Sequence, residues 1–464
     1  MTRRWKIGVG GALLTLTLVI AIAVGFGRPM LEIATGYKAK MLCSEVFVAG
    51  RAPADVVAEL ESQDLTALRF ISASIDHRTR TATVRAPLGI MTREARFRDS
   101  GGCLLAFDRQ PPPAAADQPR NEPAPSATDL ASSQGTEMKT RLTAVLDDAF
   151  SETDRTRPRQ TRAIVLMSNG QIVAERYATG FTAATPMLGW SMAKSVVNAL
   201  AGILVGHGRL ALDAPVRVPL WSAPDDPRNR ITLDHLLRMS SGLRFDEEMT
   251  KPVTDILTAL FRIPDMAAFA ADKPLEAAPG TRWQYSSGTS LILSGVIRSV
   301  LGDVEYRTFP RAALFDPIGM SSAVLETDAT GTFAASSFMY ATAGDWARLG
   351  QLYLQDGVWN GSRILPEGWV TYSRTPAPAH PTGAYGAHFW LQIPEEYGAS
   401  HAPLPNDAFH AAGHEGQFVT IIPSRQVVIV RLGKTRYGGV WDQSAFVSNV
   451  LRALAPVAGS PGSR

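Results

Sequence analysis

The chain lacks the signatures by which metal-dependent, nucleotide-dependent and nucleic-acid-binding proteins are recognised. Its 464 residues include only two cysteines and eight histidines, and these form no cluster at metal-ligand spacing. It has neither a Walker loop nor a Gly-x-Gly-x-x-Gly turn after a strand. The net charge is only +3, from 46 basic and 43 acidic residues, and no basic run is interleaved with aromatic residues beyond the extreme N-terminus. We therefore expect no metal, no cofactor and no nucleic-acid partner.

Charge is also absent from residues 7–26, which form an uncharged apolar run directly after three basic residues. As a helix, this run would be about 30 Å long, which is the thickness of one bilayer core. The basic flank predicts a cytoplasmic segment 1–6, a transmembrane signal anchor over 7–27 and an exported remainder. A signal peptide is the alternative, because Ala21-Ile22-Ala23 fits a cleavage site. The sequence thus predicts a periplasmic catalytic part, anchored in the inner membrane or secreted.

The only two cysteines, Cys43 and Cys103, fall in a segment that we expect to form a small α+β domain over residues 28–108. Export makes a disulfide between them plausible, and two buried free thiols are the alternative. A domain of this size has a marginal core, so a disulfide would stabilise it by about 2–4 kcal/mol. Its expected elements are a strand, a helix and a hairpin-like pair of strands, over residues 46–48, 53–60, 70–75 and 81–85.

A linker rich in proline and alanine, residues 109–136, precedes a large domain over 137–455 and a flexible tail over 456–464. Asn169-Gly170 between alternating apolar runs is a strong hairpin signal. Apolar strands return near the end of the large domain, while its middle is mostly helical. Strands at both ends predict one antiparallel sheet built from both termini of the domain and flanked by helices, together with a mostly helical subdomain.

Ser191-Met192-Ala193-Lys194 places a nucleophile and an amine one helical turn apart. Side chains at i and i+3 share a helix face, so the Lys194 amine can reach the Ser191 hydroxyl. The helix that follows is apolar, and burial lowers the pKa of a lysine towards the range where it acts as a base. A surface lysine on an amphipathic helix is the alternative interpretation.

Two later motifs supply partners for an activated serine. In Tyr285-Ser286-Ser287, the tyrosine hydroxyl can relay a proton and Ser287 can hydrogen-bond Lys194 or substrate. His414-Glu415-Gly416-Gln417 opens a strand, where glycine allows close backbone approach and a backbone N–H can help to form an oxyanion hole. A tyrosine that only packs and a purely structural histidine are the alternatives.

The order Ser-x-x-Lys, Tyr-x-Ser and His-x-Gly before a strand resembles the serine β-lactamase and penicillin-binding protein superfamily. Within it, the chain is most similar to class C-like β-lactamase-related hydrolases, esterases and 6-aminohexanoate-dimer hydrolases. Tyr285-Ser286-Ser287, in place of the commoner Tyr-x-Asn, points towards the last group. The resemblance implies an α+β fold of the β-lactamase/DD-peptidase type for the large domain.

The resemblance also implies roles for individual residues. Ser191 would be acylated, Lys194 would be the base and Tyr285 would shuttle the proton. Ser287 would stand for the family's asparagine and His414 for the lysine of its Lys-Thr-Gly motif.

In this interpretation, Gly416 allows close backbone approach and the backbone N–H groups of Ser191 and Gln417 bind the oxyanion. Histidine carries no fixed positive charge at neutral pH, so an ester or linear amide is favoured over a carboxylate-bearing β-lactam. Lys434-Thr435-Arg436 lacks the glycine of Lys-Thr-Gly and follows the next strand, so we interpret it as unrelated to that motif.

Three other interpretations remain open. Gly189-Trp190-Ser191-Met192-Ala193 is one residue from the nucleophile motif of α/β-hydrolases, although that fold needs a strand just before it. A membrane-tethered, non-catalytic binder of cell-wall peptide is the second, and DD-peptidase or β-lactamase activity is the third. The expected partner is a small-molecule or short-peptide ester or amide, and the sequence leaves the oligomeric state open.

Overall fold

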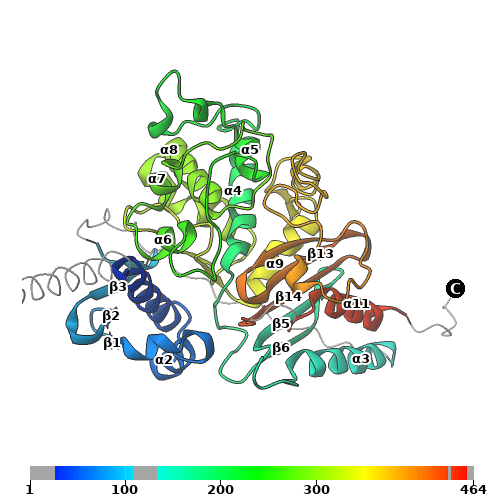
Figure 1. Ribbon diagram of the computed structural model, residues 1–464. Helices are drawn as coiled ribbons and strands as arrows, with labels where there is room; N and C mark the ends of the chain where they lie inside the picture. The colour runs from blue at the N-terminus through cyan, green and yellow to red at the C-terminus, as the bar shows by residue number, and fades with distance from the viewer. Residues whose placement is uncertain (1–26, 100, 108–132, 437–439, 457–464) are drawn as a thin grey trace, which may run out of the picture.

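The structure, a computed structural model, describes residues 27–99, 101–107, 133–436 and 440–456. The expected segment 1–6 and span 7–27 lie outside these residues except for Gly27, and so do most of the expected linker 109–136 and nearly all of the tail 456–464. Within the described ranges, no helix combines the length and the apolar composition needed to cross a membrane. The described chain forms a small part at the N-terminal end, packed against a larger one (Figure 1).

The small part pairs a helix over residues 27–47 with a four-stranded antiparallel sheet of order β1-β2-β3-β4. Its remaining elements are α2 (Pro53–Leu60), the 3₁₀ helix Gln63–Phe70, β1 (Ser72–Asp76), β2 (Thr81–Arg85), the 3₁₀ turn Pro87–Gly89, β3 (Thr92–Arg98) and β4 (Gly102–Leu105). The helix over 53–60 is confirmed, and so is the hairpin, although its first strand begins two residues later than expected.

The predicted strand at residues 46–48 is wrong, because the chain is helical up to residue 47. Val46 completes a buried stripe with Ala39, Leu42 and Cys43 at helical spacing. A short apolar run fits a buried strand and a buried helix equally well, so the periodicity within residues 46–48 could not distinguish the two. The expected linker is also too long at its end, since α3 (Ser133–Phe150) already includes residues 133–136.

The large part contains a five-stranded antiparallel sheet of order β12-β13-β14-β5-β6, so strands from both ends of the large domain share one sheet, as predicted. Its strands are β5 (Thr161–Ser168), β6 (Gln171–Tyr177), β12 (Phe409–Gly413), β13 (Gln417–Ile422) and β14 (Val427–Gly433). The β5–β6 hairpin turns at Asn169 and Gly170, both at positive φ (50° and 78°), as the favoured two-residue hairpin turn requires.

Helices cover both faces of this sheet. Val165 and Val430 face the side covered by α9 (Ala343–Leu354), whereas Ile164 and Ile429 face α3 and α11 (Gln443–Leu454). Successive strand residues point to opposite faces, so alternate side chains belong to different apolar clusters. The result is a helix–sheet–helix sandwich, with α3 and α11 together on one side (Figure 1).

The helical region between β6 and β12 stands beside this sandwich (Figure 1). Its helices are α4 (Ala193–Gly206), α5 (Leu233–Leu237), α6 (Asp255–Phe261), α7 (Met266–Ala271), α8 (Ser287–Pro310) and α10 (Trp369–Ser373). Its short strands are β7 (Met187–Leu188), β8 (Val324–Leu325), β9 (Met339–Ala341), β10 (Val358–Trp359) and β11 (Ser362–Arg363). The mostly helical middle of the large domain is therefore confirmed.

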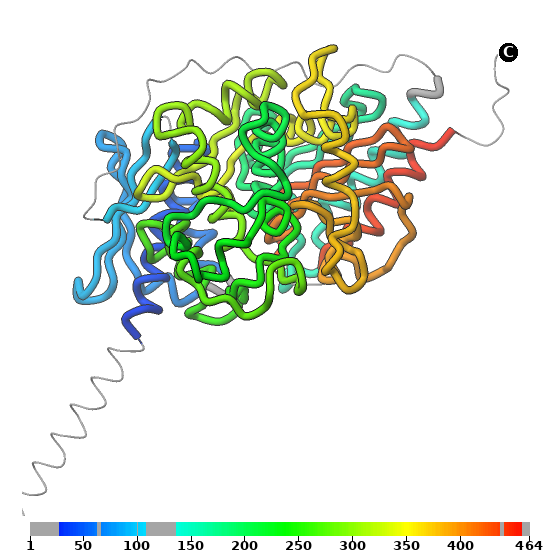
Figure 2. The backbone as a smooth tube through the Cα atoms, turned by 90° about the horizontal axis from the view of Figure 1, so that it is seen from above, coloured from blue at the N-terminus to red at the C-terminus, as the bar shows by residue number. Residues whose placement is uncertain are grey.

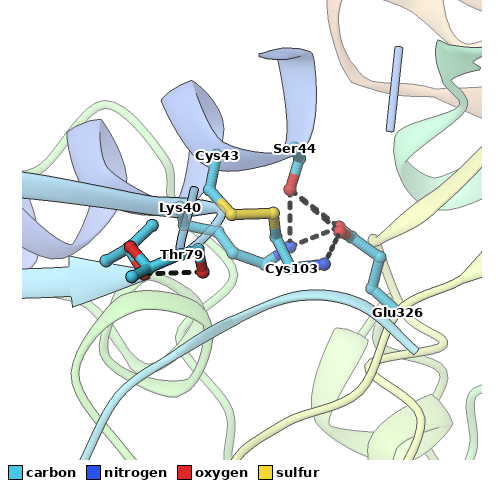
Figure 3. The surroundings of a disulfide bond; sticks show 7 residues. Lys40, Cys43, Ser44, Thr79, Cys103 and Glu326 are labelled. Atoms are coloured by element: carbon cyan, nitrogen blue, oxygen red, sulfur yellow. Dashed lines mark hydrogen bonds and ion pairs between the residues drawn. A yellow bond between two sulfur atoms is a disulfide. The ribbon is translucent and has the colours of Figure 1, made fainter. Parts of the chain in front are cut away.

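The small part is joined to the large part by polar bonds as well as by a continuous apolar core. The predicted disulfide between Cys43 and Cys103 is present. Beside it, the carboxylate of Glu326 accepts hydrogen bonds from the Cys103 backbone N–H (2.6 Å) and the Ser44 hydroxyl (2.9 Å), and it pairs with Lys40 (Figure 3). Because Glu326 follows β8 of the large part, this buried cluster links the two parts directly.

Candidate active site

Ser191 and Lys194 lie together at the start of α4. Ser191 is in the 3₁₀ turn Trp190–Met192 that leads into the helix, and it is partly exposed. The Lys194 side chain is buried, with 1% of the residue exposed. Its Nζ donates to Ser191 Oγ (2.9 Å), Ser287 Oγ (3.0 Å) and the Ser336 carbonyl (2.9 Å). The expected serine–lysine pair is therefore formed, and its serine is open to solvent.

Close backbone packing fixes the position of Ser191. A Cβ on Gly189 would lie 2.3 Å from the Trp346 ring, and a Cβ on Gly413 would lie 2.2 Å from the Gly189 carbonyl oxygen. Trp190 has a positive φ of 47°, which is unfavourable for a bulky residue. Its indole N–H donates to Glu415 Oε2 (3.1 Å). The two glycines thus bring the end of β12 against the turn that presents Ser191.

Burial gives the Lys194 amine the character of a base. Loss of solvation lowers its pKa to about 8, against the opposing attraction of Glu247, which raises it. A lysine with a pKa near neutrality is deprotonated in a useful fraction of molecules, and it can then accept a proton from a hydroxyl in hydrogen-bond contact. Ser191 Oγ is the hydroxyl placed to give that proton.

Glu247 is a member of the site that the sequence did not reveal. The Ser287 hydroxyl donates to Glu247 Oε1 (2.5 Å) and the Ser287 backbone N–H donates to Oε2 (2.7 Å). The carboxylate therefore lies at the N-terminus of α8, where the helix dipole favours negative charge. Burial raises the pKa of Glu247, while Lys194 and the Ser287 hydrogen bonds lower it. No motif spacing marked Glu247, because it comes from a loop 40 residues away from Ser287.

Tyr285 lies against both members of the pair. Lys194 Nζ is 4.9 Å from the centre of the Tyr285 ring, and the tyrosine hydroxyl interacts with the Ser191 side chain. Burial raises the pKa of Tyr285 well above its ordinary value, and the negative charge of Glu247 adds to the effect. The hydroxyl therefore stays protonated at neutral pH.

His414, Gly416 and Gln417, which the sequence predicted as substrate-binding residues, have different surroundings in the structure. His414 is exposed and packs edge-on to Trp190, with 5.5 Å between ring centres. Gly416 has a φ of 79°, and a Cβ there would lie 2.5 Å from Arg431 Nη1. The Gln417 side chain is bonded to the backbone of Gly433 at both N and O, so it secures β13 against β14. Only backbone groups of Gln417 therefore remain for a role towards substrate, which is the role that the sequence predicted.

Aromatic side chains and one carboxylate lie near Tyr285. Tyr285 stacks on Trp390 at 5.6 Å between ring centres, and Trp283 approaches Trp390 at 6.2 Å. Both tryptophans are partly exposed. Burial raises the pKa of Glu396, which also interacts electrostatically with His414 and Tyr285. The residues that contact Tyr285 or interact with it electrostatically therefore include aromatic rings and the acidic Glu396.

Lys434 does not belong to this group of side chains. It is buried, and its amine pairs with Glu59 of α2, which also pairs with Arg162 of β5. The lysine that follows β14 therefore connects the small part to the central sheet, in agreement with its interpretation as unrelated to a Lys-Thr-Gly motif.

Comparisons with known proteins agree with this geometry. The family model described as Beta-lactamase matches residues 146–448. The 6-aminohexanoate-dimer hydrolase of Paenarthrobacter ureafaciens is 25% identical over 325 residues, which is 64% of this chain and 79% of that protein. A solved Bacillus anthracis protein assigned as a 6-aminohexanoate-dimer hydrolase is 25% identical, with a TM-score of 0.54, over 67% of this chain and 80% of that chain.

A solved family VIII carboxylesterase shows the same fold at lower identity. It is 17% identical, with a TM-score of 0.51, over 70% of this chain and 99% of that chain. At this identity the likeness concerns the fold alone.

Proposed function

This chain belongs to the Beta-lactamase family and is a serine hydrolase, and from that premise we propose that it cleaves an ester or linear amide through an acyl-enzyme on Ser191. Lys194 is the base and Tyr285 the proton shuttle. The observation that carries the proposal is the contact of 2.9 Å between the buried Lys194 amine and the partly exposed Ser191 hydroxyl. A base whose pKa lies near 8 because of burial suits the activation of a serine.

Acylation begins when neutral Lys194 accepts the hydroxyl proton of Ser191 while Oγ attacks the substrate carbonyl carbon. The oxyanion that forms is bound by the backbone N–H groups of Ser191 and Gln417, and the close packing of Gly413 on Gly189 supports this placement. When the intermediate collapses, the leaving group takes a proton from the Tyr285 hydroxyl. Tyr285 regains one from protonated Lys194.

Deacylation uses the same groups in the opposite direction. A water molecule gives a proton to the Tyr285–Lys194 pair and attacks the acyl carbonyl, and Ser191 leaves with the returned proton. Glu247 acts as a positioning residue through its two hydrogen bonds to Ser287, which in turn accepts a hydrogen bond from Lys194. Its negative charge stabilises the protonated form of Lys194 between the two proton transfers.

We propose a substrate that is neutral or carries an amine, and not one recognised through a carboxylate. His414 stands where related enzymes place a lysine, and Glu396 adds negative charge near His414 and Tyr285. The partly exposed rings of Trp283 and Trp390 offer an apolar surface for the chain of such a substrate. The hydrolysis of an aminohexanoate dimer, named for two relatives, is one reaction of this kind.

We further propose that the enzyme acts outside the cytoplasm, at the periplasmic face of the inner membrane. The disulfide between Cys43 and Cys103 supports this location, because disulfides persist in oxidising compartments. The uncharged run 7–26 after three basic residues supports attachment to the membrane.

The test is to compare the purified full chain with its Ser191→Ala and Lys194→Ala variants. We expect the unaltered protein to take a fluorophosphonate label at Ser191 and to hydrolyse short-chain p-nitrophenyl esters. Both variants should lose these activities while remaining folded, as circular dichroism checks. Ser362→Ala and Lys273→Ala, which alter a serine on β11 and a lysine paired with Asp255, are matched controls.

Absence of both label and turnover in the unaltered protein would overturn the proposal in favour of a non-catalytic binder. Full activity of Lys194→Ala would exclude the Ser–Lys mechanism. Substrate class follows from paired p-nitrophenyl esters and anilides whose acyl chains end in a methyl, an amine or a carboxylate. We expect the carboxylate forms and a chromogenic β-lactam to be the poorest substrates, and the reverse order would contradict the proposed substrate class.

A further inference from the structure

Four large apolar side chains of the small part are strongly exposed. The exposed fraction is 50% for Met30, 71% for Phe70, 99% for Leu88 and 68% for Ile90. Single exposed apolar residues are ordinary in soluble proteins, whereas several grouped at one place mark a contact surface. The relevant question is therefore whether these four lie together.

The sheet register places three of them at one end of the small part. Ser72 of β1 pairs with Arg85 of β2, and Arg85 pairs with Thr92 of β3. Phe70 precedes β1 at that end, and the β2–β3 connection, which carries Leu88 and Ile90, leaves the sheet at the same end.

The 27–47 helix begins at this end as well. Thr35 Oγ1 lies 3.4 Å from Met91 Sδ in the β2–β3 connection, whereas Phe47, at the last helical residue, packs on His77 beyond the opposite end of the sheet. Met30 is one and a half turns before Thr35 and belongs to the same end. Figure 2 shows the small part forming one side of the molecule, with the first turn of this helix at its outer edge. We call these four residues the apolar end.

The β2–β3 connection is a tight turn that holds its apolar side chains outward. The Ala86 backbone N–H donates to the Met91 carbonyl (2.9 Å), and the Gly89 N–H donates to the Ala86 carbonyl (3.0 Å). Leu88 has a positive φ of 58° within this turn. A left-handed leucine that is almost fully exposed is costly in water, both in backbone energy and in hydration.

Cations accompany the apolar end. Arg69 and Arg85 are exposed there, next to Phe70 and to the start of the β2–β3 connection, and exposed Arg28, next to Met30, pairs with Glu32. Two carboxylates near this end are bonded within the protein: Glu32 pairs with Arg28 and Arg262, and Glu61 pairs with Lys38. Exposed arginines beside apolar side chains are the combination that binds a lipid surface with anionic headgroups.

We propose that the apolar end rests on the surface of an anionic phospholipid bilayer, with Phe70, Leu88 and Ile90 inserted among the headgroups. The uncharged run 7–26 ends directly before Gly27, where the described helix begins. If that run crosses the bilayer, Met30 follows the membrane surface by about 5 Å of helix. The apolar end is then held at the depth that interfacial side chains occupy. This inference depends on the membrane location proposed above and not on the chemistry of Ser191.

The experiment uses the full chain reconstituted into vesicles of phosphatidylcholine and phosphatidylglycerol. A bimane probe is attached to Leu88→Cys or Ile90→Cys, and the two native cysteines do not compete because they are disulfide-bonded. Quenching is measured with lipids that carry a doxyl group high on the acyl chain. The matched control is Val304→Cys on α8, a residue that is 77% exposed and has Asp303 and Glu305 as neighbours.

We expect lipid quenching at residues 88 and 90 to exceed that at residue 304 at least threefold. Quenching should decrease in vesicles without phosphatidylglycerol and in an Arg69→Ser/Arg85→Ser background. Equal quenching at 88 and 304 would overturn the inference. Shielding of the probe without lipid, together with disulfide crosslinks between two molecules of the Leu88→Cys variant, would assign the surface to a second copy of the chain instead.

Hydrolysis of a soluble p-nitrophenyl ester is measured on the same vesicles. Activity without quenching at residue 88 rejects the membrane contact alone. Quenching without activity rejects only the hydrolase proposal, so the two failures are distinguishable.

Discussion

Among the buried lysines of the described residues, Lys194 and Lys40 have similar neighbours and are suited to different tasks. Lys194 contacts Ser191 and Ser287, and Ser287 connects it to Glu247. Lys40 contacts Ser44 (3.0 Å) and pairs directly with Glu326, next to the disulfide (Figure 3). Each lysine thus has a serine hydroxyl and a glutamate within reach.

The difference lies in the position of the carboxylate and in access to solvent. Burial lowers the pKa of both lysines, and the glutamate opposes this effect in both. Glu326 touches the Lys40 amine, and both side chains are sealed from water, so the pair serves as an ionic link between the two parts of the protein. Glu247 is separated from Lys194 by one hydroxyl, and Ser191 is open to solvent, so that amine can exchange its proton with a reacting group. In the proposed mechanism, the Ser287 hydroxyl between amine and carboxylate leaves Lys194 able to act as a base, whereas Lys40 is held in a direct ion pair.

The largest expected effect is a loss of catalysis when Lys194 is replaced. Lys194→Met should reduce ester hydrolysis by about 10³–10⁴-fold, because the serine loses its base. Lys40→Met should keep the activity of each folded molecule. The measurement is kcat/KM per folded molecule, with the folded fraction taken from circular dichroism at a temperature where both variants are folded. Comparable losses of kcat/KM in the two variants would contradict the assignment of Lys194 to catalysis and of Lys40 to stability.

The next largest expected effect is a loss of stability when Lys40 is replaced. Lys40→Met leaves the buried Glu326 carboxylate without its cation and should lower the free energy of unfolding by about 3–5 kcal/mol. The double variant Lys40→Met/Glu326→Gln should lose less than the single variant, since no unpaired charge remains. Urea unfolding of the two variants checks this order. A double variant that is less stable than the single one would contradict the unpaired carboxylate as the cause of the loss.

The disulfide should stabilise the Lys40 cluster and leave the Lys194 site unchanged. Cys43→Ala/Cys103→Ala opens a loop of 60 residues and should lower the free energy of unfolding by about 2–4 kcal/mol. Adding a reductant to the unaltered protein should reproduce the loss in urea. Ester hydrolysis by the folded variant should stay within twofold of the original, and a larger decrease would mean that the cluster also positions Ser191.

The smallest expected effect is a shift in pH dependence. The base must be neutral to act, so activity should rise with pH through the pKa of Lys194. Glu247 stabilises protonated Lys194, and Glu247→Gln therefore lowers that pKa and moves the rise to lower pH by about one unit. The measurement is the pH profile of kcat/KM for a neutral ester. Glu248→Gln, which alters the exposed neighbouring carboxylate, is the control and should leave the profile in place. A shift to higher pH would contradict the assigned role.

Local sequence patterns predicted the elements that carry the site. The Asn169-Gly170 turn specified the β5–β6 hairpin, and the apolar run after Ser191 specified α4, because both signals lie within a few residues of the structure they form. The i, i+3 spacing likewise determined the Ser191–Lys194 contact. The end of the 27–47 helix was predicted as a strand, because its last apolar residues taken alone fit a strand as well as a helix.

Glu247 and Glu326 could not be predicted in the same way. Their partners lie 40 residues away at Ser287 and 286 residues away at Lys40, and no spacing rule relates such positions. The grouping of Phe70, Leu88 and Ile90 similarly depends on strand register and on the direction of the helix beside them.

The sequence by itself determined the family, the β5–β6 hairpin, the apolar helix after Ser191 and the contact between Ser191 and Lys194. These follow from residue types at short spacing, which local geometry converts directly into contacts. The tertiary structure alone decided which carboxylate each buried lysine faces and how closely. Electrostatic interactions depend on distance and burial in space, and folding sets both by bringing together segments that are remote along the chain.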